Sequence, residues 1–173
     1  MYWTDRHSKP ACLKERKCII NSTEDRIAVY TGIFGKYDEI HESVWSGENV
    51  DFFCISDEET DQQKLKKTRW IDAKTVIPDY ITGNKEKNRY IKMHSDQIFA
   101  GYRYTLYIDG RVQIVSDVRN LFEKSVTGIS CFLHPIRKCI YKEAVACVAL
   151  GLVSIEQILP QIEEVRRRFA EPA

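Results

Sequence analysis

The sequence predicts an α/β fold with a mainly parallel β-sheet flanked by helices. Three observations predict it: short apolar segments typical of strands recur along the chain, amphipathic segments typical of helices lie among them, and the strand-like segments end at polar residues. In a parallel sheet the carboxyl ends of the strands meet at one edge, where open α/β sheets bind ligands. We therefore expect these polar residues to surround one pocket.

The composition is that of an ordinary folded domain. Of 173 residues, 43% are hydrophobic and 29% charged, with a formal net charge of +1. This charge gives no indication of nucleic-acid binding, and no apolar run approaches the roughly 18 residues of a transmembrane segment. The N-terminus lacks an apolar signal core, so we expect a cytoplasmic protein. The six cysteines show no C-x-x-C spacing and are expected to be free thiols.

Regular structure is expected to begin at Arg26. Residues 1–25 are mixed and charged, and we interpret them as an N-terminal arm before one domain, residues 26–173. Strands are expected over residues 26–31, 50–55, 69–72, 104–108 and 128–133, and helices over 84–99, 118–124, 140–151 and 154–169.

Two of the expected strands end at residues suited to a nucleotide. The first ends at Thr31 and Gly32, where the missing glycine side chain would let a nucleotide approach the backbone. The second is followed by Asp57, and a carboxylate there often meets a ribose in nucleotide-binding α/β folds. Glycine turns and solvated acidic turns are also common, so both explanations stay open.

The segment Tyr104–Gly110 is the one around which the site is expected to form. Its apolar, β-branched run stops abruptly at Asp109 and Gly110. The Asp109 carboxylate suits Mg²⁺ or Mn²⁺, and such an ion can hold a diphosphate. Asp-Gly is equally a common hairpin signal, with residues 111–115 as a possible return strand.

The helix expected over residues 84–99 has Asn84 as its candidate N-cap. Arg89 and Lys92, three positions apart, could reach one phosphate group together. Solvation of both side chains is the simpler explanation and is favoured without further evidence.

Two later segments carry further expectations. His134 follows a strand and precedes Pro135, so its ring could contact a sugar hydroxyl, assist a departing phosphate or only fix the loop. Ser154 and Gln157 match a capping box for the last helix. Pro160 lies too far inside that helix for a first-turn position and is expected to kink or restart it.

Five segments also resemble, in the same order, a family of glycosyltransferase-like domains. The family occurs in plant cell-wall and mucilage hexosyltransferases and in bacterial polysaccharide-synthesis proteins. The segments are Val29–Asp38, Asp51–Asp57, Asn88–Met93, Tyr104–Gly110 and His134–Ala144. The resemblance extends from about Arg26 to the C-terminus.

The resemblance implies a GT-A-like fold, a nucleoside-diphosphate sugar donor and a glycan or polysaccharide acceptor. Asp109 would contact Mn²⁺ or Mg²⁺ or the diphosphate, in place of the family's Asp-x-Asp metal motif. The other implied contacts are Thr31 and Asp57 near the nucleoside, Arg89 and Lys92 near the diphosphate, and His134 and Arg137 near the sugar and acceptor.

The function that the resemblance implies is transfer of a hexose from the donor to a glycan. The alternative is a non-catalytic module that binds nucleotide sugar or glycan and retains only the donor half. Two departures bear on the choice. Position 107 is Tyr, which leaves one carboxylate in the Asp109 segment, and the chain ends shortly after the last helix, so we expect a C-terminally shortened version.

Overall fold

The computed structural model describes residues 2–5, 26–58, 65–123, 128–132 and 135–169. The chain divides into two compact units, Met1–Cys131 and Phe132–Ala173.

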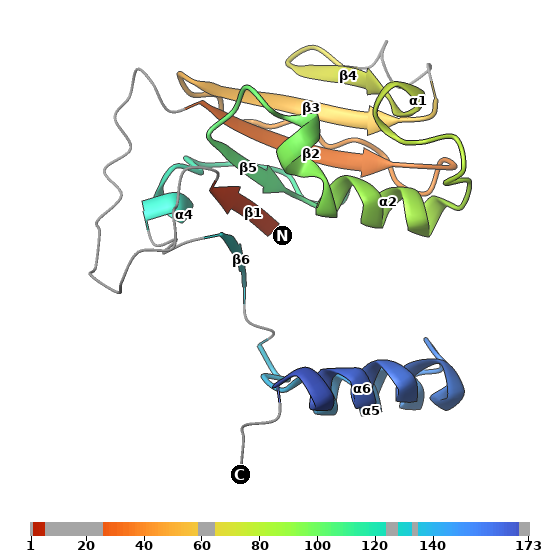
Figure 1. The fold of residues 1–173 in the computed structure, drawn as a ribbon. Coiled ribbons are helices and arrows are strands. Elements are labelled where there is room, and N and C mark those ends of the chain that lie inside the picture. Colours follow the sequence, from red (N-terminus) through yellow and green to blue (C-terminus); the bar gives the residue numbers. More distant parts are fainter. Residues whose placement is uncertain (1, 6–25, 59–64, 124–127, 133–134, 170–173) are drawn as a thin grey trace. The chain divides into compact units, whose positions relative to one another are not determined.

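A six-stranded sheet forms the first unit (Figure 1). Its strands are β1 (Tyr2–Asp5), β2 (Ile27–Ile33), β3 (Val50–Ser56), β4 (Thr68–Asp72), β5 (Tyr104–Tyr107) and β6 (Ile129–Cys131), in the order β4-β3-β2-β5-β1-β6. The four strands β4, β3, β2 and β5 pair in parallel, whereas β1 is antiparallel to both β5 and β6. The parallel sheet that the sequence predicts is therefore confirmed.

The order of the parallel strands reverses beside β2. From β2 the chain moves outward to β3 and β4, and then returns to place β5 on the other side of β2. Such a reversal leaves a crevice beyond the carboxyl ends of the two central strands, because the connections leave in opposite directions. The ends of β2 and β5 are thus the place where this topology favours a ligand.

Strand β1 is a correction to the sequence analysis, which expected no regular element before Arg26. Its residues, Tyr2–Asp5, pair with β5 on one side and β6 on the other. Four residues are too few to show a period of their own. The segment is a strand because it forms hydrogen bonds with two neighbouring strands, and a local sequence pattern cannot reveal such partners.

The helix expected over residues 84–99 is divided in two. Helix α2 spans Asn84–Met93 and α3 spans Ser95–Ile98, with His94 between them at φ −116° and ψ 22°. The expected N-cap is also wrong by one residue. Gly83 has the extended backbone of the cap, and Asn84 is already the first helical residue. Two short helices, α1 (Ala73–Val76) and α4 (Asn120–Glu123), complete the helices of this unit.

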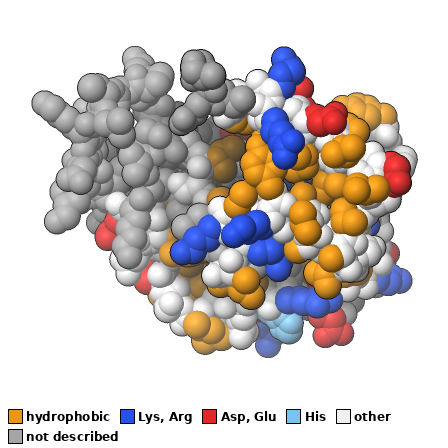
Figure 2. Space-filling model, turned by 90° about the horizontal axis from the view of Figure 1, so that it is seen from below, with side chains coloured by type: hydrophobic (Ala, Val, Ile, Leu, Met, Phe, Trp, Pro, Cys, Tyr) orange, Lys and Arg blue, Asp and Glu red, His pale blue; other side chains and the backbone are white. Residues whose placement is uncertain are grey.

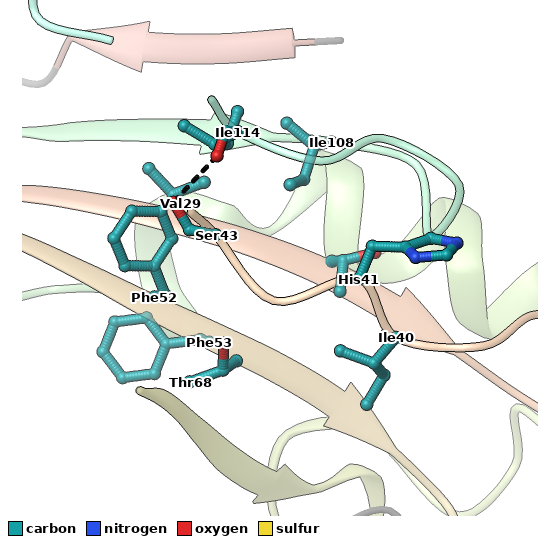
Figure 3. A pocket seen from close by; sticks show the side chains of 10 residues that line it. Val29, Ile40, His41, Ser43, Phe52, Phe53, Thr68, Ile108 and Ile114 are labelled. Atoms are coloured by element: carbon teal, nitrogen blue, oxygen red, sulfur yellow. Dashed lines mark hydrogen bonds between the residues drawn. The ribbon is translucent and has the colours of Figure 1, made fainter. Parts of the chain in front are cut away.

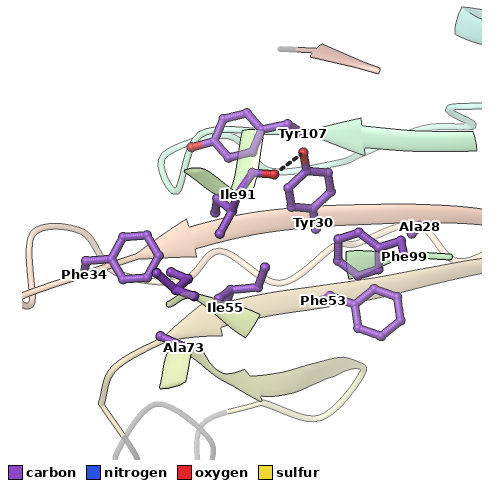
Figure 4. Close-up of a cluster of buried hydrophobic side chains, with 10 residues drawn as sticks. Ala28, Tyr30, Phe34, Phe53, Ile55, Ala73, Ile91, Phe99 and Tyr107 are labelled. Carbon is purple, nitrogen blue, oxygen red and sulfur yellow. Dashed lines mark hydrogen bonds between the residues drawn. The ribbon is translucent and has the colours of Figure 1, made fainter. Parts of the chain in front are cut away.

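Buried side chains cover both faces of the sheet. Along β2, Ile27 and Val29 belong to one hydrophobic cluster, whereas Ala28 and Tyr30 belong to the other, as the two-residue period of a strand requires. On the second face, Ile91 of α2 is fully buried (Figure 4). Helix α2 is thereby held across this face, and its exposed side is free to contribute to the edge of the sheet.

The second unit is a helical hairpin of α5 (Ile140–Ala149) and α6 (Ile155–Phe169). The capping box is confirmed, since the Ser154 N–H donates to Gln157 Oε1 and the Gln157 N–H donates to Ser154 Oγ. Helix α6 continues through Pro160, so the expected restart there is wrong. Many apolar side chains of this hairpin are exposed. Figure 2 shows hydrophobic side chains at the surface of one face, beside lysines and arginines.

Candidate functional site

A cavity of about 630 Å³ opens at the carboxyl ends of β2 and β5. This volume lies within the range of small-molecule sites. Loops, strand ends and α2 contribute its lining: Gly32, Ile33, Phe34, Gly35, Tyr37, Asp38, Asn84, Lys85, Asn88, Lys92, Tyr107, Asp109, Gly110 and Arg111. Its location coincides with the reversal of strand order, so topology and shape indicate the same site.

The end of β5 contributes an exposed carboxylate. The side chain of Asp109 is 64% exposed, and its Oδ1 lies 3.6 Å from Lys92 Nζ. The same ammonium group lies 4.2 Å from the centre of the Tyr107 ring. Asn88 and Lys92 are four residues apart on α2 and therefore lie on the same face of the helix, and both line the cavity. Lys92 thus points into the site with its charge near one carboxylate and one aromatic face.

The Asp-Gly turn expected here is present, but the return strand is not. The Val112 N–H donates to the Asp109 carbonyl over 2.9 Å, which closes a turn. Residues 111–115 contain no strand, because their backbone groups pair with a loop. The turn and the ligand-site explanations are therefore compatible.

Tyr107 supplies a neutral hydroxyl to the floor of the cavity. The residue is 1% exposed, and burial, the largest influence, raises the pKa of its hydroxyl. The Asn88 amide donates to this oxygen over 3.3 Å. At neutral pH the group keeps its proton, so Tyr107 provides a donor and no negative charge where the Asp-x-Asp pattern would have a carboxylate.

Asp38 and Arg111 form a second charged pair in the lining. Arg111 Nε donates to Asp38 Oδ1 over 2.9 Å, and the Asp38 side chain is 19% exposed. Asp38 also lies beside Gly110, where an added Cβ would be 3.1 Å from the Asp38 Cβ. Sequence reasoning missed both residues as site residues, since they are 73 positions apart and only the fold brings them together.

Hydrogen bonds join the loop after β2 to the segment after β5. The Ile114 carbonyl accepts from the Val44 N–H over 2.9 Å and from Ser43 Oγ over 3.2 Å (Figure 3). Gln113 Nε2 donates to the Glu42 carbonyl over 2.9 Å. Two walls of the cavity, carrying Asp38 and Arg111, are therefore held together as one frame.

Asp57, expected near the nucleoside, is engaged within the protein. Its Oδ1 accepts the Gly35 N–H over 3.1 Å, and its Oδ2 lies 3.0 Å from Lys87 Nζ. Burial acts to raise the pKa of Asp57, but the hydrogen bonds from Gly35 and Lys87 outweigh it and lower the pKa. Asp57 is not among the lining residues, whereas Gly35, which it holds at φ +64°, is. Its place in the structure is that of a support for the loop.

Thr31 and Gly32 face opposite sides of the sheet. Gly32 lines the large cavity, and an added Cβ there would lie 2.3 Å from Ile91 Cδ1, so a glycine lets α2 pack closely on β2. Thr31 lines a separate cavity of about 20 Å³ between β2 and the loop around His41 (Figure 3). That volume is close to the space of one water molecule, too small for a nucleoside.

Neither Arg89 nor Arg137 is among the residues that line this cavity. Arg89 is exposed on α2. Arg137 belongs to the second unit, where its guanidinium pairs with the Glu143 carboxylate. His134 lies outside the described residues. The binding and catalytic roles assigned to these residues stay predictions.

The donor set gives a direct test of the expected metal site. Among the described residues, no three His, Cys, Asp or Glu side chains gather in a group that could hold a metal ion. The carboxylates of the cavity lining belong to Asp38 and Asp109, and each already has a basic partner. Metal binding by Asp109 remains a prediction, and this donor set fits it poorly.

The sheet, its reversal and the cavity together define a Rossmann-like α/β domain with a cavity at the carboxyl edge of its sheet. The family model of the TOD1/MUCI70 glycosyltransferase-like domain matches residues 12–168. The chain therefore belongs to the TOD1/MUCI70 glycosyltransferase-like domain family. Comparisons with curated proteins and with solved structures found no match. Among the helices that the structure describes, none combines the length and the apolar character of a membrane span.

Proposed function

We propose that the chain transfers a hexose from a nucleoside-diphosphate sugar to a glycan acceptor. The observation that carries the proposal is the cavity at the ends of β2 and β5, whose lining combines three basic side chains with the amides of α2. The basic residues are Lys85, Lys92 and Arg111. A pocket of this composition suits a ligand that carries both phosphates and hydroxyl groups.

In the proposed reaction the bond between the anomeric carbon and the diphosphate breaks, an acceptor hydroxyl oxygen bonds to that carbon, and the proton of this hydroxyl passes to solvent or to the departing diphosphate. The nucleoside diphosphate leaves with the electron pair, so negative charge grows on its oxygens. Donors already aimed at these oxygens favour the transition state over the ground state. Lys92 and Arg111 are the charged groups of the lining best suited to this task, and the Tyr107 hydroxyl adds a neutral donor.

The test is a panel of nucleoside-diphosphate sugars incubated with the full chain, with release of free sugar and transfer to oligosaccharide mixtures both measured. We expect release or transfer from one donor, and loss of at least about tenfold in Lys92→Met. Lys74→Met, which changes an exposed lysine of α1, is the matched control.

The same panel separates the enzyme from a binding module. Saturable donor binding without any sugar release would support the non-catalytic alternative. Failure of every donor to bind would remove both functions.

A further inference from the structure

We propose that basic side chains of the cavity, rather than a divalent cation, neutralise the diphosphate of the bound nucleotide. Lys92 is the central residue, and Arg111 and Lys85 assist it. The inference rests on the proposed function, because it concerns the ligand of the same cavity. It assigns binding roles to Arg111 and Lys85, and it makes metal dispensable for donor binding.

The position of Lys92 carries the first step. A divalent ion that bridges a diphosphate to Asp109 would have to lie within about 2.0–2.6 Å of a carboxylate oxygen. Lys92 Nζ already lies 3.6 Å from Asp109 Oδ1, and the Tyr107 ring beneath it holds the ammonium at 4.2 Å. A positive charge is therefore already present beside this carboxylate, although it lies farther from the oxygen than a bound ion would.

The surroundings of Lys92 hold it there. Its side chain is 25% exposed, and the attraction between the ammonium and the Tyr107 ring favours this position. Position 107 is Tyr and has no carboxylate, so it does not supply the second acidic ligand of an Asp-x-Asp metal site. Tyr107, which stands where the metal motif has a carboxylate, is thus the residue that positions the Lys92 ammonium.

Arg111 provides a second cation at the mouth of the cavity. Its side chain is 74% exposed, and its Nε is engaged by Asp38. A guanidinium has five N–H donors in a fixed fork, so one contact with Asp38 leaves others able to bind phosphate oxygens. Lys85, exposed on the first turn of α2, adds a third positive charge.

The charge of the lining supports this assignment. Among the lining residues that the structure describes, three are basic and two are acidic, a balance of one positive charge. A Mg²⁺ site has the opposite character, with an excess of carboxylate oxygens around the ion. Asp38 and Asp109 would both have to lose their basic partners to create that excess.

Calorimetry of the full chain tests the inference, with UDP, GDP, ADP and CDP and the matching nucleosides as probes, each in EDTA and in Mg²⁺ or Mn²⁺. We expect one diphosphate to bind in EDTA within about threefold of its affinity with metal, and more tightly than its nucleoside. In EDTA, Lys92→Met and Arg111→Met should each weaken that binding about tenfold. Lys92→Arg should keep most of the affinity, and Lys74→Met should leave it unchanged.

Asp109→Asn distinguishes neutralisation by basic side chains from neutralisation by a metal ion, because the two predict opposite changes in diphosphate affinity. If basic residues hold the diphosphate, removing this negative charge should keep or raise affinity in EDTA and in metal alike. A diphosphate that binds only with metal, and no longer binds in Asp109→Asn, would overturn the inference and leave the proposed function standing. Absence of binding in every condition would overturn both. Arg111 is largely exposed, so its variant reports on binding even if changes at Lys92 disturb folding.

Discussion

The ends of β3 and β5 carry carboxylates with the same position in the topology and opposite surroundings. Asp57, after β3, is 20% exposed and engaged by a backbone N–H and by Lys87. Asp109, after β5, is 64% exposed and has Lys92 at 3.6 Å. The comparison teaches that a polar residue at the carboxyl edge is not by itself a ligand residue. Here the carboxylate after β5 lines the cavity, whereas the carboxylate after β3 supports a loop that lines it.

The largest difference between the two ends is expected in stability. Asp57→Ala leaves the Gly35 N–H and the Lys87 ammonium without this acceptor, and should lower the free energy of unfolding by about 1–3 kcal/mol. Asp109→Ala removes an exposed contact and should change it by less than about 0.5 kcal/mol. Urea unfolding of both variants measures the two values. Equal losses would mean that the two carboxylates play the same structural part.

A smaller effect is expected at the glycine that Asp57 holds. Gly35 has φ +64°, which a residue with a Cβ adopts only with strain, so Gly35→Ala should cost about 1 kcal/mol. Gly101→Ala is the control, because an added Cβ there meets nothing within 4 Å and its φ is not positive. Thermal unfolding of the two variants should show a clear loss only for Gly35. A similar loss in both would point to a general effect of adding a side chain.

The smallest effect is expected in acid. The pKa of Asp57 is lowered in the folded protein, since hydrogen bonds from Gly35 and Lys87 outweigh the opposing effect of burial. A carboxyl with a lowered folded pKa stabilises the protein above its unfolded pKa, and this contribution is lost as pH falls through the folded pKa. The stability advantage of the wild type over Asp57→Asn should therefore shrink between about pH 5 and about pH 2. If the stability difference between the wild type and Asp57→Asn stays constant with pH, the lowered pKa of Asp57 is not its cause.

The sequence predicted the parallel sheet because each of its strands is a short apolar segment that can be recognised from neighbouring residues alone. Apolar runs such as Val50–Ser56, which ends at polar residues, can be recognised in the sequence, although β2, expected over residues 26–31, extends to Ile33. Strand β1 and the division of the expected helix at His94 were missed, since each depends on partners or on one backbone angle that no local pattern contains.

Only those residues of the candidate site that lie at strand ends or on the predicted helix could be predicted from the sequence. Asp109, Gly110, Gly32 and Lys92 line the cavity, and all four lie at strand ends or on the predicted helix. Arg89 was paired with Lys92 by its spacing of three, but it is Asn88, four residues before Lys92, that shares the cavity with it. Asp38 and Arg111 could not be found, because their contact depends on how two loops meet.

Those two loops have a consequence for local motion. Because the Ile114 carbonyl accepts both the Val44 N–H and Ser43 Oγ, neither loop can swing away without breaking the hydrogen bonds of the other. Exchange of the Val44 amide with solvent deuterium therefore requires both cavity walls to open together. A ligand that bridges Arg111 to the opposite side of the cavity should slow this exchange, although it would not touch Val44. That one amide can thus serve as a remote reporter of cavity occupancy.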